Sequence, residues 1–123
     1  MVLRKARRGA RPSRLGQPAP LISGVDPDGQ PVSVDPEGRT VYFLTSSCRP
    51  CLAVWAALGG DGPVVVTPDP SAESRRKVAE LAPPGATVVM STDAWFAYGA
   101  GPAPWAVSVS GATVVAEGPA APV

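Results

Sequence analysis

Residues 40–58 read TVYFLTSSCRPCLAVWAAL, and this segment combines a strand pattern, a cysteine pair and a helix pattern. Residues 40–45 are β-branched, aromatic and apolar at their centre, which is typical of a central strand buried on both faces of a parallel sheet. Residues 51–58 are good helix formers with apolar side chains three and four positions apart, and two glycines follow them. The segment therefore predicts a strand that leads into a helix, with a C-x-x-C motif at the junction.

The position of Cys48 and Cys51 favours redox chemistry. Unpaired backbone N–H groups and the positive dipole end at a helix N-terminus stabilise a thiolate, and one helical turn brings two sulfurs within disulfide reach. Arg49 adds a positive charge beside Cys48, and Pro50 completes the motif. We expect Cys48 to be the exposed nucleophile and Cys51 the buried resolving thiol. A purely structural disulfide and a zinc site shared between two chains are the alternative interpretations.

The amino-acid composition excludes many other types of catalytic and metal site. The 123 residues include no histidine and only two cysteines, which excludes Ser-His-Asp and Cys-His catalysis, histidine-ligated zinc, blue copper and c-type haem attachment. A zinc or iron-sulfur site made of cysteine alone needs about four thiolates, so one chain supplies half of it at most. We therefore expect neither a metal nor a cofactor.

Charge and turn residues divide the chain into a tail and one domain. Six of the eleven basic residues lie in residues 1–14, so residues 15–123 carry five basic against ten acidic groups. This acidic balance argues against nucleic acid as a ligand. We expect a basic disordered tail over residues 1–14, a domain over 15–118 and a short tail over 119–123. Glycine (13) and proline (16) make up about a quarter of the chain, and most of them fall between the expected elements.

No stretch approaches the roughly 20 apolar residues of a membrane span, and no apolar signal-peptide core follows the basic start. As written, the chain is expected to be soluble and cytoplasmic. The basic tail would also suit a membrane-tethered, extracytoplasmic protein with an anchor upstream of this sequence, and membrane contact is expected only through that tail or anchor.

The remaining patterns predict a β-hairpin, two β-α-β crossovers and a second hairpin. The first hairpin joins residues 21–22 and 32–34 around a Pro-Asp-Gly turn. Asp69 and Pro70 predict the start of a helix that runs to Leu81, and Asp93 predicts the cap of a single helical turn through Tyr98. The other expected strands cover residues 64–67, 88–90, 105–109 and 113–115.

A strand, a C-x-x-C motif at a helix start, a β-α-β unit and a proline that opens a hairpin resemble the thioredoxin superfamily. Within it, the Gly16–Pro20 segment GQPAP, the Asp28-Gly29 hairpin and residues 43–51 (FLTSSCRPC) look most like the TlpA-like membrane-tethered disulfide reductases. The thioredoxin-like accessory proteins of methylamine dehydrogenase maturation are the most similar group. The resemblance covers about residues 15–118 and implies an α/β thioredoxin-like fold, with a central mixed sheet flanked by helices and an N-terminal hairpin extension.

The resemblance also implies a site. It pairs Cys48 with Cys51 in a redox-active disulfide and places a cis-proline against them, for which Pro104 is the best match and Pro102 the fallback. The backbone of Ala103 would then pair with an extended substrate segment. Trp105, at the start of the next strand, is expected either to contact substrate or to pack in the core.

Three departures from the family pattern stand out. Ser47 replaces the tryptophan that commonly precedes the first cysteine in thioredoxins. The central strand carries no acid to relay a proton, so water or the Thr45 hydroxyl would have to modulate the second thiol. Residues 118–123 are too short to form the family's last helix, which we expect to be missing or truncated.

The sequence thus predicts a thiol-disulfide oxidoreductase that exchanges disulfides with protein substrates and is reset by an upstream redox partner. One alternative is a binding or assembly factor whose fold matters more than turnover. The other is a peroxiredoxin-like thiol peroxidase, because the Thr45-x-x-Cys48 spacing occurs in that group.

Overall fold

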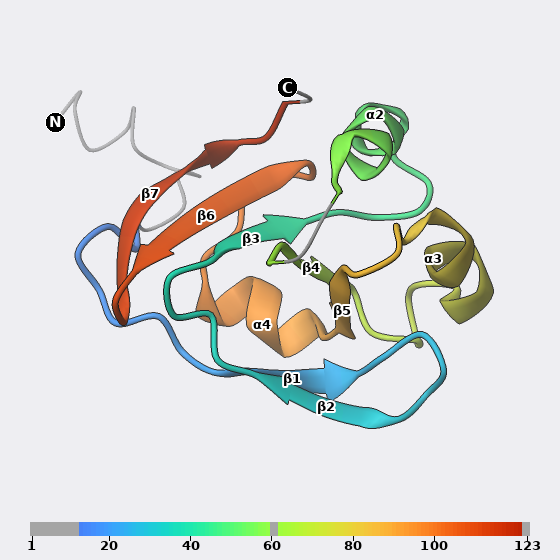
Figure 1. The fold of residues 1–123 in the computed structure, drawn as a ribbon, viewed down its shortest axis with the longest axis horizontal. Helices are drawn as coiled ribbons and strands as arrows, with labels where there is room; N and C mark the ends of the chain where they lie inside the picture. The colour runs from blue at the N-terminus through green and yellow to red at the C-terminus, as the bar shows by residue number, and fades with distance from the viewer. Residues whose placement is uncertain (1–12, 60–61, 122–123) are drawn as a thin grey trace, which may run out of the picture.

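The computed structural model describes residues 13–59 and 62–121, so the predicted basic tail, apart from Ser13 and Arg14, lies outside the described residues. The elements are β1 (Ile22–Val25), β2 (Pro31–Val34), β3 (Thr40–Phe43), α2 (Arg49–Ala57), β4 (Val64–Thr67), α3 (Arg75–Leu81), β5 (Thr87–Met90), α4 (Thr92–Ala97), β6 (Trp105–Ser110) and β7 (Thr113–Pro119) (Figure 1). The predicted element order is confirmed.

The strands form one mixed seven-stranded sheet in the order β2-β1-β5-β4-β3-β6-β7. β3, β4 and β5 are parallel, with Val41 opposite Val64 and Val65 opposite Val88, which confirms the predicted crossover between residues 40–45 and 64–67. The outer strands pair antiparallel as two hairpins, β1 with β2 and β6 with β7. Because β3 and β4 are interior, both of their faces must be covered.

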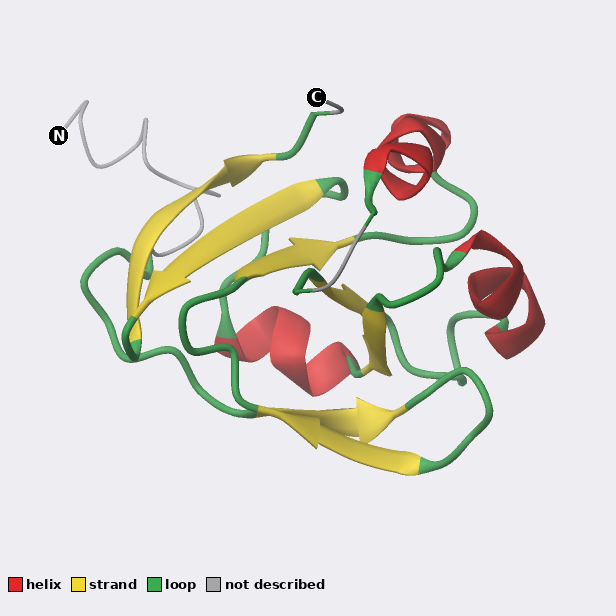
Figure 2. Ribbon diagram, in the orientation of Figure 1, coloured by secondary structure: helices red, strands yellow, loops and turns green. Residues whose placement is uncertain are grey.

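Helices on both faces provide that cover (Figure 2). On one face, α4 packs through Ala94 and Tyr98 against side chains that include Val41 and Phe43 of β3. On the other face, α2 and α3 pack against side chains that point the opposite way, among them Leu44 and Met90. Because successive side chains of a strand point to opposite faces, Leu44 faces an apolar layer separate from that of Val41 and Phe43. This second layer also contains Cys51, Val54 and Trp55 of α2 and Val78 of α3.

Two helix starts differ from the prediction. The helix predicted from Asp69 begins only at Arg75, because the Asp69 carboxylate accepts hydrogen bonds from the backbone and hydroxyl of Ser71 and so forms a turn instead. Ser74 caps α3 by accepting from the N–H of Lys77 at 3.2 Å. Ser91, and not Asp93, caps α4. In both places a serine directly before the first helical residue has the extended backbone that an N-cap requires.

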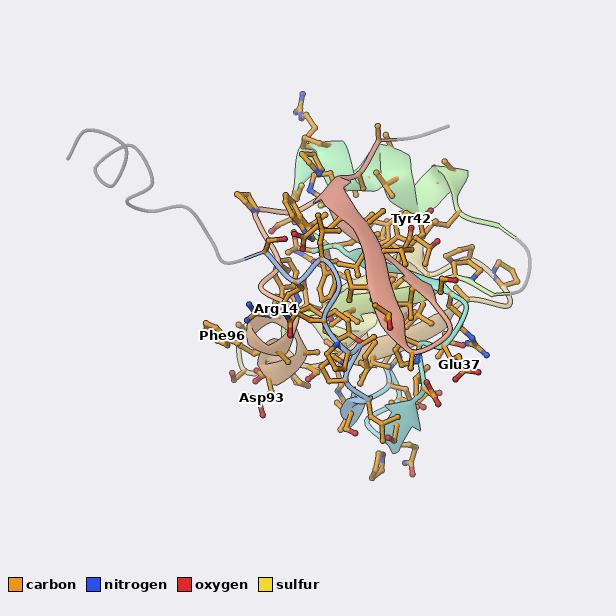
Figure 3. All side chains as sticks on the ribbon, turned by 90° about the vertical axis from the view of Figure 1, so that its left-hand side faces the viewer. Arg14, Glu37, Tyr42, Asp93 and Phe96 are labelled. Carbon is orange, nitrogen blue, oxygen red and sulfur yellow. The ribbon has the colours of Figure 1, made fainter. Side chains whose placement is uncertain are left out.

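Residues 13–19 lie along the outer edge of β7. The N–H of Gly16 donates to the carbonyl of Val114 at 2.9 Å, and the N–H of Val114 donates to the carbonyl of Gln17 at 3.0 Å. The guanidinium of Arg14 donates to the carbonyl of Phe96 at the end of α4, beside the exposed Phe96 ring (Figure 3). The segment that leads into the domain therefore covers one edge of the sheet and the end of a helix.

The residues that follow β7 lie close to the start of β6. β7 reaches Pro119, and the N–H of Ala120 donates to the carbonyl of Pro104 at 2.9 Å. Within the described part of the chain, which ends at Ala121, no helix follows β7. Among the same residues, no helix is both long and apolar enough to cross a bilayer.

Candidate active site

The two cysteines lie at the start of α2, directly after β3. Cys48 is the N-cap of the helix: its Sγ accepts a hydrogen bond from the N–H of Cys51 at 3.2 Å. Pro50 occupies the first turn, where its missing N–H leaves no helical bond unmade. Both cysteines are free thiols, Cys48 half-buried and Cys51 buried. The sulfur of Cys48 therefore lies where the helix N-terminus presents its unpaired donors.

Cys51 has a strongly perturbed environment. Its side chain is fully buried among apolar residues of α2, α3 and the sheet. Burial, assisted by the hydrogen bond and charge of Cys48, raises the pKa of the Cys51 thiol to about 11. Hydrogen bonds from the backbone and the hydroxyl of Thr45 oppose this rise, since they lower the same pKa. Thr45, a predicted site residue, is half-buried two positions beyond the end of β3.

The loop before β6 supplies the other wall of the site. The Cys48 thiol donates to the carbonyl of Ala103 at 3.7 Å, and the Ala103–Pro104 peptide bond is cis. Trp105 follows as the first residue of β6, paired with Phe43 of β3. Gly101 is needed here, because a Cβ at this position would lie 2.7 Å from atoms of the Trp105 ring. Of the predicted residues, Ala103 contacts Cys48 and Pro104 follows it through the cis peptide bond. Trp105 packs against the layer on the other face of the sheet, which contains Phe43 and Tyr98, and Pro102 is exposed.

Arg49 and Pro50 are exposed on the first turn of α2. They directly follow Cys48 in the chain. Leu52 is also exposed on the same helix. This surface presents one cation, one proline ring and one apolar side chain beside the accessible thiol.

Glu73 is a site residue that the sequence did not predict. Its carboxylate accepts hydrogen bonds from the backbone N–H of Ser46 at 2.9 Å, from the Ser46 hydroxyl at 2.5 Å and from the N–H of Ser74 at 2.8 Å. It therefore ties the loop before α3 to the residue two positions before Cys48. No sequence signal marks Glu73, because it lies 25 positions after Cys48 and inside a segment predicted as helix.

Trp55 fixes the same stretch of backbone from the opposite side. Its indole N–H donates to the carbonyl of Thr45 at 3.1 Å, and its side chain is buried in the layer that contains Cys51. The peptide group between Thr45 and Ser46 is therefore held at both ends, its carbonyl by Trp55 and its N–H by Glu73.

A hollow of about 360 Å³ lies beside α2 and is lined by Tyr42, Val54 and Leu58 among others, and neither cysteine borders it. Among the described residues, no three histidine, cysteine or acidic side chains come together as metal ligands would.

No protein-family model and no curated protein matches the sequence. Among solved structures, a thioredoxin-family thiol:disulfide interchange protein of Chlorobium tepidum superposes with a TM-score of 0.58 at 24% identity, over 91% of this chain and 90% of that chain. The thioredoxin domain of a thiol-disulfide oxidoreductase of Bacteroides vulgatus gives 0.58 at 21%, over 84% and 86%. The chain has a thioredoxin-like fold.

A third thioredoxin-like relative has a different description. BsSco, a member of the Sco family of cytochrome c oxidase assembly proteins with a disulfide switch, superposes with a TM-score of 0.53 at 11% identity, over 87% of this chain and 86% of that chain. The thioredoxin-like fold of this chain is thus similar to folds found in interchange proteins and in an assembly protein.

Proposed function

We propose that the protein is a thiol-disulfide oxidoreductase that acts on protein substrates through Cys48 and Cys51. The observation that carries the proposal is the unequal placement of the two thiols: Cys48 is accessible at the N-cap of α2, and Cys51 is buried one turn later. A nucleophile needs access and donors for its thiolate, whereas a resolving thiol needs only proximity to the first.

The reaction proceeds in two steps. The Cys48 thiolate attacks one sulfur of a substrate disulfide, a Cys48–substrate disulfide forms, and the other substrate sulfur leaves as a thiolate. Cys51 then loses its proton and attacks the Cys48 Sγ, which releases the second substrate thiolate and forms the Cys48–Cys51 disulfide. Two electrons pass from the protein to the substrate, and the same steps run backwards oxidise a substrate dithiol.

Substrate binding involves the loop before β6. The carbonyl of Ala103 is within hydrogen-bond distance of Cys48, so an extended segment paired with the Ala103 backbone would bring its disulfide to the nucleophile. Pro104 and Trp105 follow Ala103 in the chain, and Arg49 and Pro50, which are exposed on α2, would contact the same partner. The hairpin β1–β2 supports a TlpA-like protein in particular, reset by a redox partner upstream of it.

Trapping experiments test the proposal. The Cys51→Ala variant is expected to accumulate a mixed disulfide with a model substrate such as oxidised insulin, because the first step remains and the second is lost. The Cys48→Ala variant is expected to lose exchange altogether. Both variants keep one thiol, so each is the matched control of the other, and equal activity of the Cys48→Ala variant would refute the assignment of roles.

An assembly role is the second candidate, favoured by the similarity to a protein described as a cytochrome c oxidase assembly factor. In that case the double variant with Cys48→Ser and Cys51→Ser would retain function in the cell, since binding and not electron transfer would matter. A third result, fast peroxide consumption with sulfenic acid at Cys48, would instead indicate the peroxidase alternative.

A further inference from the structure

The turn between β3 and α2 leads the chain to the nucleophile, and two side chains hold this turn beyond the end of the strand. The indole N–H of Trp55 donates to the Thr45 carbonyl at 3.1 Å. The next residue, Ser46, donates its N–H to one carboxylate oxygen of Glu73 at 2.9 Å and its hydroxyl to the other oxygen at 2.5 Å. Only one residue, which is exposed, separates this two-bond contact from Cys48.

The contact between Ser46 and Glu73 is built to fix an orientation. Hydrogen bonds to a carboxylate are about twice as strong as those between neutral groups, and two of them set the direction of a residue as well as its position. Both side chains are half-buried, which limits competition from water. The carboxylate is itself held by the N–H of Ser74, the N-cap of α3, at 2.8 Å. The turn before α2 is therefore tied to the start of the neighbouring helix.

Cys48 depends on the direction in which the chain enters α2. As the N-cap, it has an extended backbone with φ −83° and ψ 120°. Its Sγ accepts from the N–H of Cys51 at 3.2 Å and donates to the carbonyl of Ala103 at 3.7 Å, so it lies between groups of two different elements. The first of these groups is a donor that stabilises the attacking thiolate. A turn that is free to rotate would carry the sulfur away from that donor.

We propose that Glu73 is a positioning residue for the nucleophile: by holding the N–H and the hydroxyl of Ser46, it keeps the Sγ of Cys48 at the N–H of Cys51. Glu73 acts only through Ser46 and does not touch the reacting atoms. The inference deepens the proposed function and rests on it, because it concerns the attack by Cys48.

The test measures that attack with 4,4′-dithiodipyridine on the reduced, full chain. Attack by the Cys48 thiolate breaks the reagent's disulfide, forms a mixed disulfide and releases one thiopyridone. Attack by Cys51 then releases the second and forms the Cys48–Cys51 disulfide, so the dithiol gives up two electrons and two protons. Stopped-flow absorbance resolves the first step as the phase that depends on reagent concentration. Because the reagent is neutral, a change of charge at position 73 neither attracts nor repels it.

The proposal predicts a graded loss in the first phase. Glu73→Ala, which removes both bonds to Ser46, is expected to slow this phase about tenfold, and Ser46→Ala, which removes one of them, about threefold. The double variant is expected to be no slower than Glu73→Ala alone, because the hydroxyl then has no acceptor left to lose.

Glu73→Gln is the conservative variant that separates the bonds to Ser46 from the bond to Ser74. Its amide oxygen can accept from the Ser46 N–H and its amide N–H can donate to the Ser46 hydroxyl, whereas the bond from the Ser74 N–H is lost. The first phase is expected to stay within about twofold of the original. Tyr98→Phe is the control for loss of stability, since it removes a hydrogen bond to the Pro20 carbonyl on the opposite face of the sheet, and it is expected to leave the phase unchanged.

The opposite results would overturn the inference. A first phase within about twofold of the original in Glu73→Ala would show that the contact does not position Cys48. If that variant does not fold, an unchanged first phase in Ser46→Ala decides the same point. Equal slowing in Glu73→Gln, or in Tyr98→Phe, would indicate an effect of charge or of stability instead. Release of only one thiopyridone by the unsubstituted protein would refute the proposed function as well, whereas the other results leave that function intact.

Discussion

Alkaline pH is expected to destabilise the reduced protein through Cys51. Burial raises the pKa of this thiol in the folded state to about 11, against 9.0 for an ordinary cysteine, so the unfolded chain loses the proton first. A group whose folded pKa is raised contributes its stability fully below the unfolded value and loses it as pH rises to the folded value. The loss therefore falls between about pH 9 and pH 11.

The size of the effect follows from the shift. A difference of about two pK units corresponds to an unfolding free energy on the order of 2–3 kcal/mol, because each unit is worth about 1.4 kcal/mol. For a chain of 123 residues, a change of this size lowers the melting temperature by roughly 10 °C.

The assay is urea unfolding of the reduced protein, followed by tryptophan fluorescence at intervals from pH 8 to pH 11.5. Tyr98 titrates in the same direction, because burial and then the nearby Asp35 carboxylate raise its pKa. The comparison is therefore between the unsubstituted protein and Cys51→Ala, which share Tyr98. The unfolding free energy of the unsubstituted protein should fall by about 2–3 kcal/mol relative to that of Cys51→Ala between pH 8 and pH 11.5.

A constant difference between the two proteins over this range would refute the reasoning, since it would mean that Cys51 ionises equally in the folded and unfolded chains. The oxidised protein supplies an internal check. Its disulfide has no thiol proton to lose, so the step attributed to Cys51 is expected to vanish on oxidation and to return on reduction.

Two further substitutions test the loops around the site. Glu73→Gln removes the charge from an acceptor of three hydrogen bonds and is expected to lower the free energy of unfolding in urea by about 1–2 kcal/mol. Glu80→Gln, on the exposed face of α3, is the control and is expected to change that free energy very little. Equal losses in the two variants would exclude an anchoring role for Glu73. Gly101→Ala is expected to lower the free energy of unfolding by about 1–3 kcal/mol, because its Cβ would meet the Trp105 ring. Gly59→Ala, which has open space around it, is the control. An unchanged melting temperature for Gly101→Ala would contradict the packing described.

The core of the fold could be predicted from the sequence because its signals are local. The apolar run of β3, the helix formers after Cys51 and the glycines that follow all lie within 20 residues, and the structure confirms the strand, the helix and the parallel partner β4. The wrong helix start predicted at Asp69 also came from a local signal. An aspartate before a proline suits a helix start, but its side chain can also close a turn with Ser71, and sequence does not distinguish the two.

In the candidate site, too, only the features that depend on neighbouring residues could be predicted. The positions of Cys48 and Cys51 follow from adjacent residues, so they could be predicted. Glu73 could not, because its contact with Ser46 depends on how the loop before α3 returns to the sheet. The bond from Trp55 to Thr45 was equally inaccessible, since Trp55 looked like an ordinary core residue at helical spacing.

The pairing of residues 13–19 with β7 has a consequence for self-association. An unpaired edge strand is a template on which further chains can add by backbone hydrogen bonds, and cross-β assemblies grow in this way. In this protein the start of one edge strand, β7, is already paired with its own chain, and the other edge strand, β2, begins with Pro31, which has no N–H to offer. Both features reduce the number of backbone groups on which a second chain could add, and removal of residues 13–19 is expected to expose more of them at β7.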